Sequence, residues 1–369
     1  VTGRALSHYK EETATIGSRT DTQIDKTPQS VQVLTETLIE DQAAHQVTDL
    51  YRSISGVSQD NVSTVTFRGF HQDEQLYDGM RGNPYKEFFT VPQLVNVEEV
   101  QAIKGPAGAL YGAGEPGGVI NYVSKKPTYE PETFIKLGAG NKDYHSAQFS
   151  SSGPVNEDAS QRYRISLYQD ESGSYRNNVD QDNQNIDLGY AWDISDDSTL
   201  TVQYTNIDQT LHGARLRGIP TDDDGNFLAD DSWNANEPGD YQALDAETFQ
   251  AKLEQYLTQD VSWDLGLRYF KGEEAQKYHE SRGLTDTDND GVDDAIRRQY
   301  RDQLRTNEGV TLSSNLVFDL DDHTILVGTD YTRNTYDYLY YRYNDPGTLS
   351  LANPVYDADT SSYSMSLVQ

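Results

Sequence analysis

Apolar and polar positions follow two different patterns along the chain, and the pattern changes at Lys125-Lys126-Pro127. After this point, segments of about ten residues alternate strictly between apolar and polar side chains, as a strand of a transmembrane β-barrel requires. In residues 261–269, for example, the odd positions are apolar and the even positions are polar or small. The alternation also predicts strands at residues 132–140, 143–152, 162–170, 186–194, 200–205, 247–257, 309–319 and 323–332, and the start of another at residue 362.

The connections between these strands are sorted by length. Those at one end of the strands are short, and those at the other end are long except for a short first connection near residues 141–142. Outer-membrane barrels are organised in this way, whereas a soluble β-sandwich has no reason to sort its loops. We therefore predict an antiparallel transmembrane β-barrel. The short connections are residues 153–161, 195–198, 258–260 and 320–322, and the long ones are residues 171–183, 209–246, 272–306 and 333–361.

The predicted strands number about ten, and the last of them begins close to residue 369. A barrel cannot leave a long apolar edge open in lipid, because the unpaired backbone groups would have no hydrogen-bonding partner there. We therefore expect the sequence to be part of a longer chain whose remaining strands close the barrel.

Residues 1–127 predict a mixed α/β globule instead of barrel strands. A short helix is expected at residues 35–42 and a second one at residues 47–54, where Thr48 or Asp49 can cap or charge the first turn. Gly56 then provides the usual helix stop. Short strands are expected at residues 62–67, 97–103 and 119–124, and residues 105–118 form a glycine-rich turn region.

Composition narrows the class of protein. The net charge of −31 argues against a nucleic-acid-binding protein, which needs a basic surface. The sequence has no run of 18 or more apolar residues and no charged-then-apolar leader, so we expect neither a transmembrane helix nor a signal peptide in it. The mean hydropathy of −0.77 is compatible with a barrel, because a barrel strand needs apolar side chains on one face only. Cys is absent, which excludes disulfides and thiolate metal sites.

Five segments of the N-terminal region carry a resemblance to a known family. In their order along the chain they resemble the plug domain of TonB-dependent outer-membrane siderophore receptors, and the later part of the chain resembles the ferrichrome-type branch more loosely. One such motif would be weak evidence, but five in order are specific. The segments are TPQSVQVL at residues 27–34, FRGF at 67–70, LYDGMR at 76–81, residues 97–118 with the core VQAIKGPAGALYG, and NYVSKKP at 121–127.

The resemblance implies a plug inside a barrel of about 22 strands in the outer membrane of a Gram-negative bacterium. It divides the chain into an N-terminal segment at residues 1–26, a plug at residues 27–127 and a partial β-barrel at residues 128–369. Such receptors import a ferric siderophore and draw energy from the partner TonB through an N-terminal box, to whose end Val1-Thr2-Gly3 is similar. They are not enzymes and require no cofactor. We expect a monomer that contacts outer-membrane lipid and lipopolysaccharide and no nucleic acid.

Several plug residues are expected to have structural roles. Two arginines and two glutamates could pair inside the water-filled barrel and hold the plug, although such charge pairs are weak evidence of stability. Two glycines are expected to allow tight turns and close backbone approach. These residues are Arg68 and Arg81, Glu98 and Glu99, and Gly105 and Gly112.

Candidate ligand contacts lie on loops of the plug and of the barrel. A ferric siderophore is already a metal complex, so its receptor needs aromatic faces and hydrogen bonds instead of metal ligands. The similarity of the loop positions to ferrichrome-type relatives favours a hydroxamate siderophore. The candidates on the plug are Asn61, His71, Gln72, Tyr85, Phe88 and Phe89, and those on the barrel are Arg217, Tyr340 and Tyr341.

One acidic stretch follows the spacing of an EF-hand-like calcium loop, with carboxylates at positions 1, 3, 5 and 9 and glycine at position 6. Position 12 is Arg297 instead of the bidentate glutamate, and no flanking helices are evident. Calcium binding and a solvated acidic loop tip are therefore alternatives. The four carboxylates are Asp286, Asp288, Asp290 and Asp294.

Some features of the sequence are also compatible with functions other than siderophore import. Residues 112–117 match GxGxxG, but Pro116 and a predicted strand follow where a dinucleotide-binding turn needs a helix. The alternatives that stay open are import of haem, cobalamin or an oligosaccharide through the same architecture, and a surface role as an adhesin or phage receptor. The plug motifs favour siderophore import, because a plug would be superfluous in an adhesin.

Overall fold

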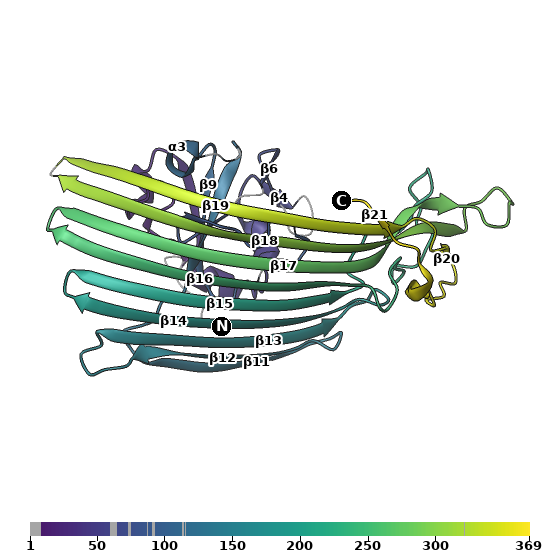
Figure 1. Ribbon diagram of the computed structural model, residues 1–369, viewed down its shortest axis with the longest axis horizontal. Coiled ribbons are helices and arrows are strands. Elements are labelled where there is room, and N and C mark those ends of the chain that lie inside the picture. Colours follow the sequence, from purple (N-terminus) through teal and green to yellow (C-terminus); the bar gives the residue numbers. More distant parts are fainter. Residues whose placement is uncertain are drawn as a thin grey trace.

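The structure is a computed structural model of the chain. Figure 1 shows a broad sheet of long strands, here called the wall, with a smaller mixed domain on one side of it. Within the described residues the wall contains the nine long strands β11 to β19, each hydrogen-bonded to the next one in the chain. The structure describes residues 9–59, 65–72, 75–86, 88–90, 93–112, 114, 116–320 and 322–369.

All long strands of the wall pair antiparallel with their neighbours, which confirms the predicted architecture. The strand expected to start at residue 362 was placed wrongly, because residues 360–362 form a short 3-10 helix, η4 (Thr360–Ser362), and only β21 (Ser366–Leu367) follows it. The strands are β11 (Glu132–Ala139), β12 (His145–Pro154), β13 (Gln161–Gly173), β14 (Asp180–Ser195), β15 (Ser198–His212), β16 (Tyr241–Thr258), β17 (Val261–Thr285), β18 (Ala295–Leu320), β19 (His323–Tyr343) and β20 (Thr348–Ser350), which pairs with β18.

The long strands extend further than the sequence alternation predicted. β17 has 25 residues and β18 has 26, so the predicted connection at 272–306 is reduced to residues 286–294. Beyond the alternating segments both faces of a strand can be polar, and backbone pairing continues without a hydrophobic signal. Alternation therefore located the strands but not their ends at the side of the long loops.

The alternation of side chains also assigns the two faces of the wall. On β17 the even-numbered Arg268, Phe270 and Glu274 are 4%, 1% and 0% exposed, whereas the odd-numbered Leu265 is 37% exposed. A Cβ added to Gly266 would lie 2.7 Å from the sulfur of Met80 in the smaller domain. The even-numbered residues of β17 thus face the smaller domain, and we call this the inner face.

The smaller N-terminal domain is built on a five-stranded sheet in the order β3-β9-β10-β7-β8, in which β10 and β7 are parallel. A three-stranded sheet β4-β5-β6 and a two-stranded sheet β1-β2 accompany it. The strands are β1 (Thr13–Ala14), β2 (Thr22–Gln23), β3 (Ser30–Leu34), β4 (Val57–Gln59), β5 (Val65–Phe67), β6 (Phe70–Gln72), β7 (Gln75–Tyr77), β8 (Met80–Arg81), β9 (Val97–Lys104) and β10 (Gly118–Ser124).

The helices of this domain are short. The first predicted helix is α1 (Glu36–Asp41), where the Thr35 hydroxyl accepts the Leu38 N–H. The second prediction corresponds to α2 (Val47–Leu50) followed by the 3-10 turn η3 (Tyr51–Ser53). The N-cap is Gln46, and Asp49 charges the first turn as predicted, because its Oδ2 accepts the Gln46 backbone N–H at 3.0 Å. The glycine-rich region also contains one helical turn, α3 (Gly108–Tyr111), and η2 (Ile24–Lys26) completes the set. None of the described helices has the length and apolar character needed to span a membrane.

We predict that Phe67→Ala destabilises the N-terminal domain by about 3–5 kcal/mol, because this side chain is 0% exposed in the larger of the domain's two apolar clusters. Chemical denaturation in detergent, followed by the fluorescence of the protein, measures the effect. The matched control is Phe70→Ala, since Phe70 is 50% exposed and its loss should change the free energy of unfolding by less than about 1 kcal/mol. Equal effects of the two variants would contradict the assigned core.

Candidate functional site

Polar side chains on the inner face of the wall hold the N-terminal domain by its backbone. Nε of Arg268 donates a hydrogen bond to the Gly82 carbonyl at 3.1 Å. Nδ2 of Asn307 donates to the Asn83 carbonyl at 2.6 Å. These bonds satisfy side chains and backbone groups that are both removed from bulk water.

Glu274 makes the central contact between the wall and the loop at residues 88–90. It is 0% exposed, and its Oε2 accepts the backbone N–H groups of Phe89 at 2.7 Å and Thr90 at 3.0 Å. Its Oε1 pairs with Nη1 of Arg305 at 3.0 Å. A buried carboxylate is costly unless it is paired and hydrogen-bonded, so this loop and the wall are ordered together.

Two of the predicted aromatic ligand contacts are buried between the domain and the wall. Tyr85 is 9% exposed and Phe88 is 1% exposed, and both pack on Ile207 and Leu244. Phe88 also lies against Gly272, where an added Cβ would be 3.0 Å from its ring. Burial raises the pKa of the Tyr85 hydroxyl, which therefore stays neutral. These residues pack the domain onto the wall in this conformation, and their contact with a ligand stays a prediction.

Phe89, the third predicted aromatic residue, lies among arginines of the wall. The guanidinium carbon of Arg215 is 3.6 Å from the centre of the Phe89 ring, and that of Arg305 is 5.0 Å from it. Arg215 is also 5.4 Å from the centre of the Tyr278 ring. These distances are in the range of cation–π interactions, so Phe89 joins the N-terminal domain to a cationic part of the inner face.

This cationic part is a three-by-three array of side chains on β17, β18 and β19, here called the arginine–tyrosine grid. Residues that pair across the three strands project from the same face of the sheet. Sequence analysis missed most of the grid, because its members come together only through the strand register. The rows are Tyr278–Arg301–Arg342, Gln276–Gln303–Tyr340 and Glu274–Arg305–Tyr338.

Of the ligand contacts predicted on the barrel, Tyr340 belongs to the grid and Tyr341 does not. Consecutive strand residues point to opposite faces, so Tyr341 lies on the outer face, apart from the grid, and its contact with a ligand stays a prediction. Tyr340 stacks on Tyr338 with ring centres 5.9 Å apart. Arg217 lies beside the grid, and its Nη2 pairs with Oε1 of Glu280 at 2.7 Å.

The predicted ligand contacts His71 and Gln72 on β6 also lie on opposite faces of their sheet. His71 is exposed, whereas the adjacent Gln72 is 2% exposed on the other face of β6. Asn61 lies outside the described residues. Only His71 of this group therefore has an exposed side chain in the described structure, and its role in binding stays a prediction.

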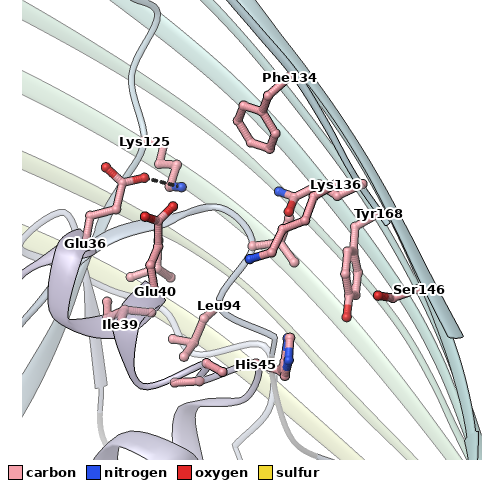
Figure 2. A pocket seen from close by; sticks show the side chains of 15 residues that line it. Glu36, Ile39, Glu40, His45, Leu94, Lys125, Phe134, Lys136, Ser146 and Tyr168 are labelled. Carbon is pink, nitrogen blue, oxygen red and sulfur yellow. Dashed lines mark ion pairs between the residues drawn. The ribbon is translucent and has the colours of Figure 1, made fainter. Parts of the chain in front are cut away.

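A separate gap between the N-terminal domain and the first strands of the wall is shown in Figure 2. Glu36 of α1 forms an ion pair with Lys125 at 2.5 Å, and Lys136 of β11 and Tyr168 of β13 line the opposite side. The cavity measures about 90 Å³, which has room for several waters but not for a chelate of drug-like size. This cavity is therefore not the candidate ligand site.

Comparison with known proteins agrees with this arrangement. Residues 23–119 match the family model of the TonB-dependent Receptor Plug Domain. These residues are thus similar to the plug domain of TonB-dependent receptors. It is 26% identical over 360 residues to the metal-pseudopaline receptor CntO of Pseudomonas aeruginosa UCBPP-PA14, covering 94% of this chain and 50% of that protein. It is 29% identical to the ferripyoverdine receptor of P. aeruginosa PAO1 over 205 residues, covering 52% of this chain and 25% of that protein.

The fold of a solved receptor is also similar. The crystal structure of the ferripyoverdine receptor of the P. aeruginosa outer membrane, bound to ferripyoverdine, superposes with a TM-score of 0.83 at 21% identity, covering 98% of this chain and 50% of that chain. The chain thus spans about half the length of the metal-pseudopaline receptor and of this structure. The N-terminal domain is accordingly called the plug. The inner face of the wall, which faces the plug, is called the lumen side of the barrel wall.

Of the four plug residues expected to pair, Arg81 and Glu99 make other contacts in the described structure, and the pairing of the four stays a prediction. Nε of Arg81 donates to the Tyr111 carbonyl at 2.8 Å, and Glu99 accepts a hydrogen bond from the Gln101 amide. The register of β9 with β10 shifts at this point, where Glu99 pairs with Val123 and Val97 with Ser124, so Glu98 lies in a bulge of the strand. Burial raises the pKa of both glutamates. Arg68, with φ +48°, lies at the tight turn beside Gly56.

Arg19, which the sequence analysis did not single out, links the N-terminal domain to the inner face of β18 and β19. Arg19 forms an ion pair with Asp330 of β19, and its Nη1 donates to Asn315 at 3.2 Å. Its guanidinium carbon lies 4.8 Å from the centre of the Tyr111 ring. The predicted glycines have the expected backbone conformations, with φ +125° at Gly105 and φ +74° at Gly112.

The acidic loop between β17 and β18 brings three of its four predicted ligands together. Carboxylate oxygens of Asp286, Asp288 and Asp290 lie within 4.8 Å of one another. Asp294 is turned away and accepts hydrogen bonds from Thr287, which lower the pKa of this carboxyl. Backbone hydrogen bonds likewise lower the pKa of Asp286. The residues present fit a calcium ion in part, and calcium binding stays a prediction.

Glu274→Ala should release the loop at residues 88–90, because it removes the acceptor of two backbone N–H groups and leaves Arg305 without its carboxylate. The expected cost is about 3–5 kcal/mol, seen as faster hydrogen exchange at the Phe89 and Thr90 amides. Glu273→Ala is the matched control, since Glu273 is on the outer face and, among the described residues, forms an ion pair with Lys271 at 3.4 Å. Unchanged hydrogen exchange at these two amides in the Glu274 variant would show that Glu274 does not hold the loop.

For the acidic loop we predict that isothermal titration with Ca²⁺ gives heat above buffer, and that Asp288→Asn lowers the affinity about tenfold or more. Asp223→Asn, a change in another exposed acidic loop, should leave the titration unaltered. Absence of heat in the unaltered protein would leave the stretch as a solvated loop tip.

Proposed function

We propose that this chain forms the plug and the first strands of an outer-membrane receptor that imports a ferric siderophore. The observation that carries the proposal is the position of the arginine–tyrosine grid, which lies on the lumen side of the wall directly beside the plug loop at Phe89. A ligand on the grid would therefore touch both parts of the receptor. The names of the relatives support the same function, since they are receptors for metal-pseudopaline and ferripyoverdine and not enzymes.

The mode of plug attachment supports import driven by TonB. The described contacts between plug and wall include partly exposed polar ones, such as the ion pair of Arg19 with Asp330. Polar contacts in a water-filled lumen can be exchanged for water at modest cost when the plug is pulled. In this proposal TonB supplies that force.

The outer face of the wall supports a place in the lipid of a Gram-negative outer membrane. Apolar and aromatic side chains stand exposed on it at alternating positions, as a lipid-facing barrel surface requires. We propose a monomer in contact with lipid and lipopolysaccharide. Examples are Ile165, Leu167, Leu188, Tyr190, Trp192 and Leu312.

The test is uptake of radioactive iron presented as a panel of ferric siderophores. Deletion of the gene should abolish uptake of at least one chelate, and complementation should restore it. Uptake should also stop in a strain without TonB. An uptake profile that is unchanged across the panel after deletion would refute the proposed function and favour an adhesin or another ligand class.

A further inference from the structure

The row Tyr278–Arg301–Arg342 of the grid contains two arginines that lie directly opposite each other on neighbouring strands. Arg301 of β18 and Arg342 of β19 are register partners on the inner face. Like charges in this arrangement destabilise a sheet. The hydrogen-bond partners of Arg301 are neutral, namely Gln299 at 2.9 Å and the Tyr278 hydroxyl at 3.3 Å. An anion placed between the two guanidinium groups would offset the repulsion.

Arg215 adds a buried cation at the same place. It is 9% exposed, and its Nε has no hydrogen-bond partner. Within the described ranges no carboxylate lies within 4.0 Å of it, and its contacts are the rings of Phe89 and Tyr278. Burial of a cation that Tyr278 and the more distant carboxylate of Glu280 compensate only in part is unfavourable, and burial lowers the pKa of this guanidinium. A ligand anion would supply the missing charge.

The charge balance around the grid is positive in a strongly acidic chain. Glu274 pairs with Arg305, and Glu280 pairs with Arg217 and reaches Arg301 only at 4.0 Å. Arg215 and Arg342 have no such partner in the part of the chain that the structure describes. The net charge of −31 repels an anion at long range, but salt screens charges beyond about 8 Å. The grid therefore acts at short range, once a chelate is in the lumen.

Resting on the proposed function, we propose that Arg215, Arg301 and Arg342 bind anionic groups of the ferric chelate and select negatively charged chelates. Guanidinium groups present paired donors that match carboxylate and other oxyanions, while Tyr338 and Tyr340 offer aromatic faces to the rest of the chelate. Three hydroxamates neutralise Fe³⁺, whereas catecholates leave a negative complex. The grid thus favours catecholate or carboxylate chelates over the hydroxamate class expected from the loop positions.

The test compares the binding of two probes to the purified receptor in detergent, by quenching of its intrinsic fluorescence. The probes are a ferric tris-catecholate and a neutral ferric trihydroxamate. The unaltered receptor should bind the tris-catecholate more tightly, and salt should weaken this binding. Arg301→Gln and Arg342→Gln should each weaken it about tenfold and change the binding of the trihydroxamate by less than about threefold.

Two further variants separate charge from folding. Arg342→Lys keeps the positive charge but not the paired donors, so it should weaken binding of the tris-catecholate less than Arg342→Gln does. Lys277→Gln removes a cation on the outer face, next to Tyr278 on β17, that pairs with Asp302 at 3.4 Å. This change should not affect the binding of either probe. Tighter binding of the trihydroxamate, or equal losses for both probes, would overturn the inference and leave the proposed function standing. Failure of any ferric chelate to bind would overturn both.

Discussion

The buried carboxylate of Glu274 is the contact on which the arrangement of plug, wall and candidate site depends. It accepts two N–H groups of the plug loop and pairs with Arg305, which in turn lies over the rings of Phe89 and Tyr338. A charge this deep in the protein is tolerated only when every oxygen is satisfied. Displacement of the loop would leave both Glu274 and Arg305 short of partners, so the plug loop and the grid are fixed to each other.

Small residues make this contact geometrically feasible. A Cβ on Gly272 would lie 2.4 Å from the Pro84 carbonyl oxygen, and a Cβ on Gly82 would lie 2.7 Å from the Phe270 ring. Close approach of the plug backbone brings the loop amides within hydrogen-bonding distance of the wall. The lumen side is therefore polar without being loosely packed, and a ligand at the grid would meet a preorganised surface.

The fold was predictable where the sequence reports a local or periodic constraint. Alternation in residues 261–269 identified a barrel strand, and Thr35 marked the start of α1 through its capping hydroxyl. The candidate site was less accessible, because a polar residue such as Arg301 looks the same in sequence whether it faces water, lipid headgroups or the plug. The run from Tyr338 to Tyr343 places aromatic side chains on both faces, so only the register with β18 separates Tyr340 from Tyr341. The partners of Glu98 and Glu99 are set by tertiary contacts and could not be assigned from the sequence.

The most direct test of this account is the position of iron in a structure of the receptor bound to a ferric chelate, located by its anomalous scattering. The account predicts iron beside the grid, with the chelate in contact with Arg301, Tyr340 and Phe89. Iron in the separate cavity of about 290 Å³ between Trp233, Pro220 and Leu284 in the long loops, with no chelate atom near the grid, would contradict it.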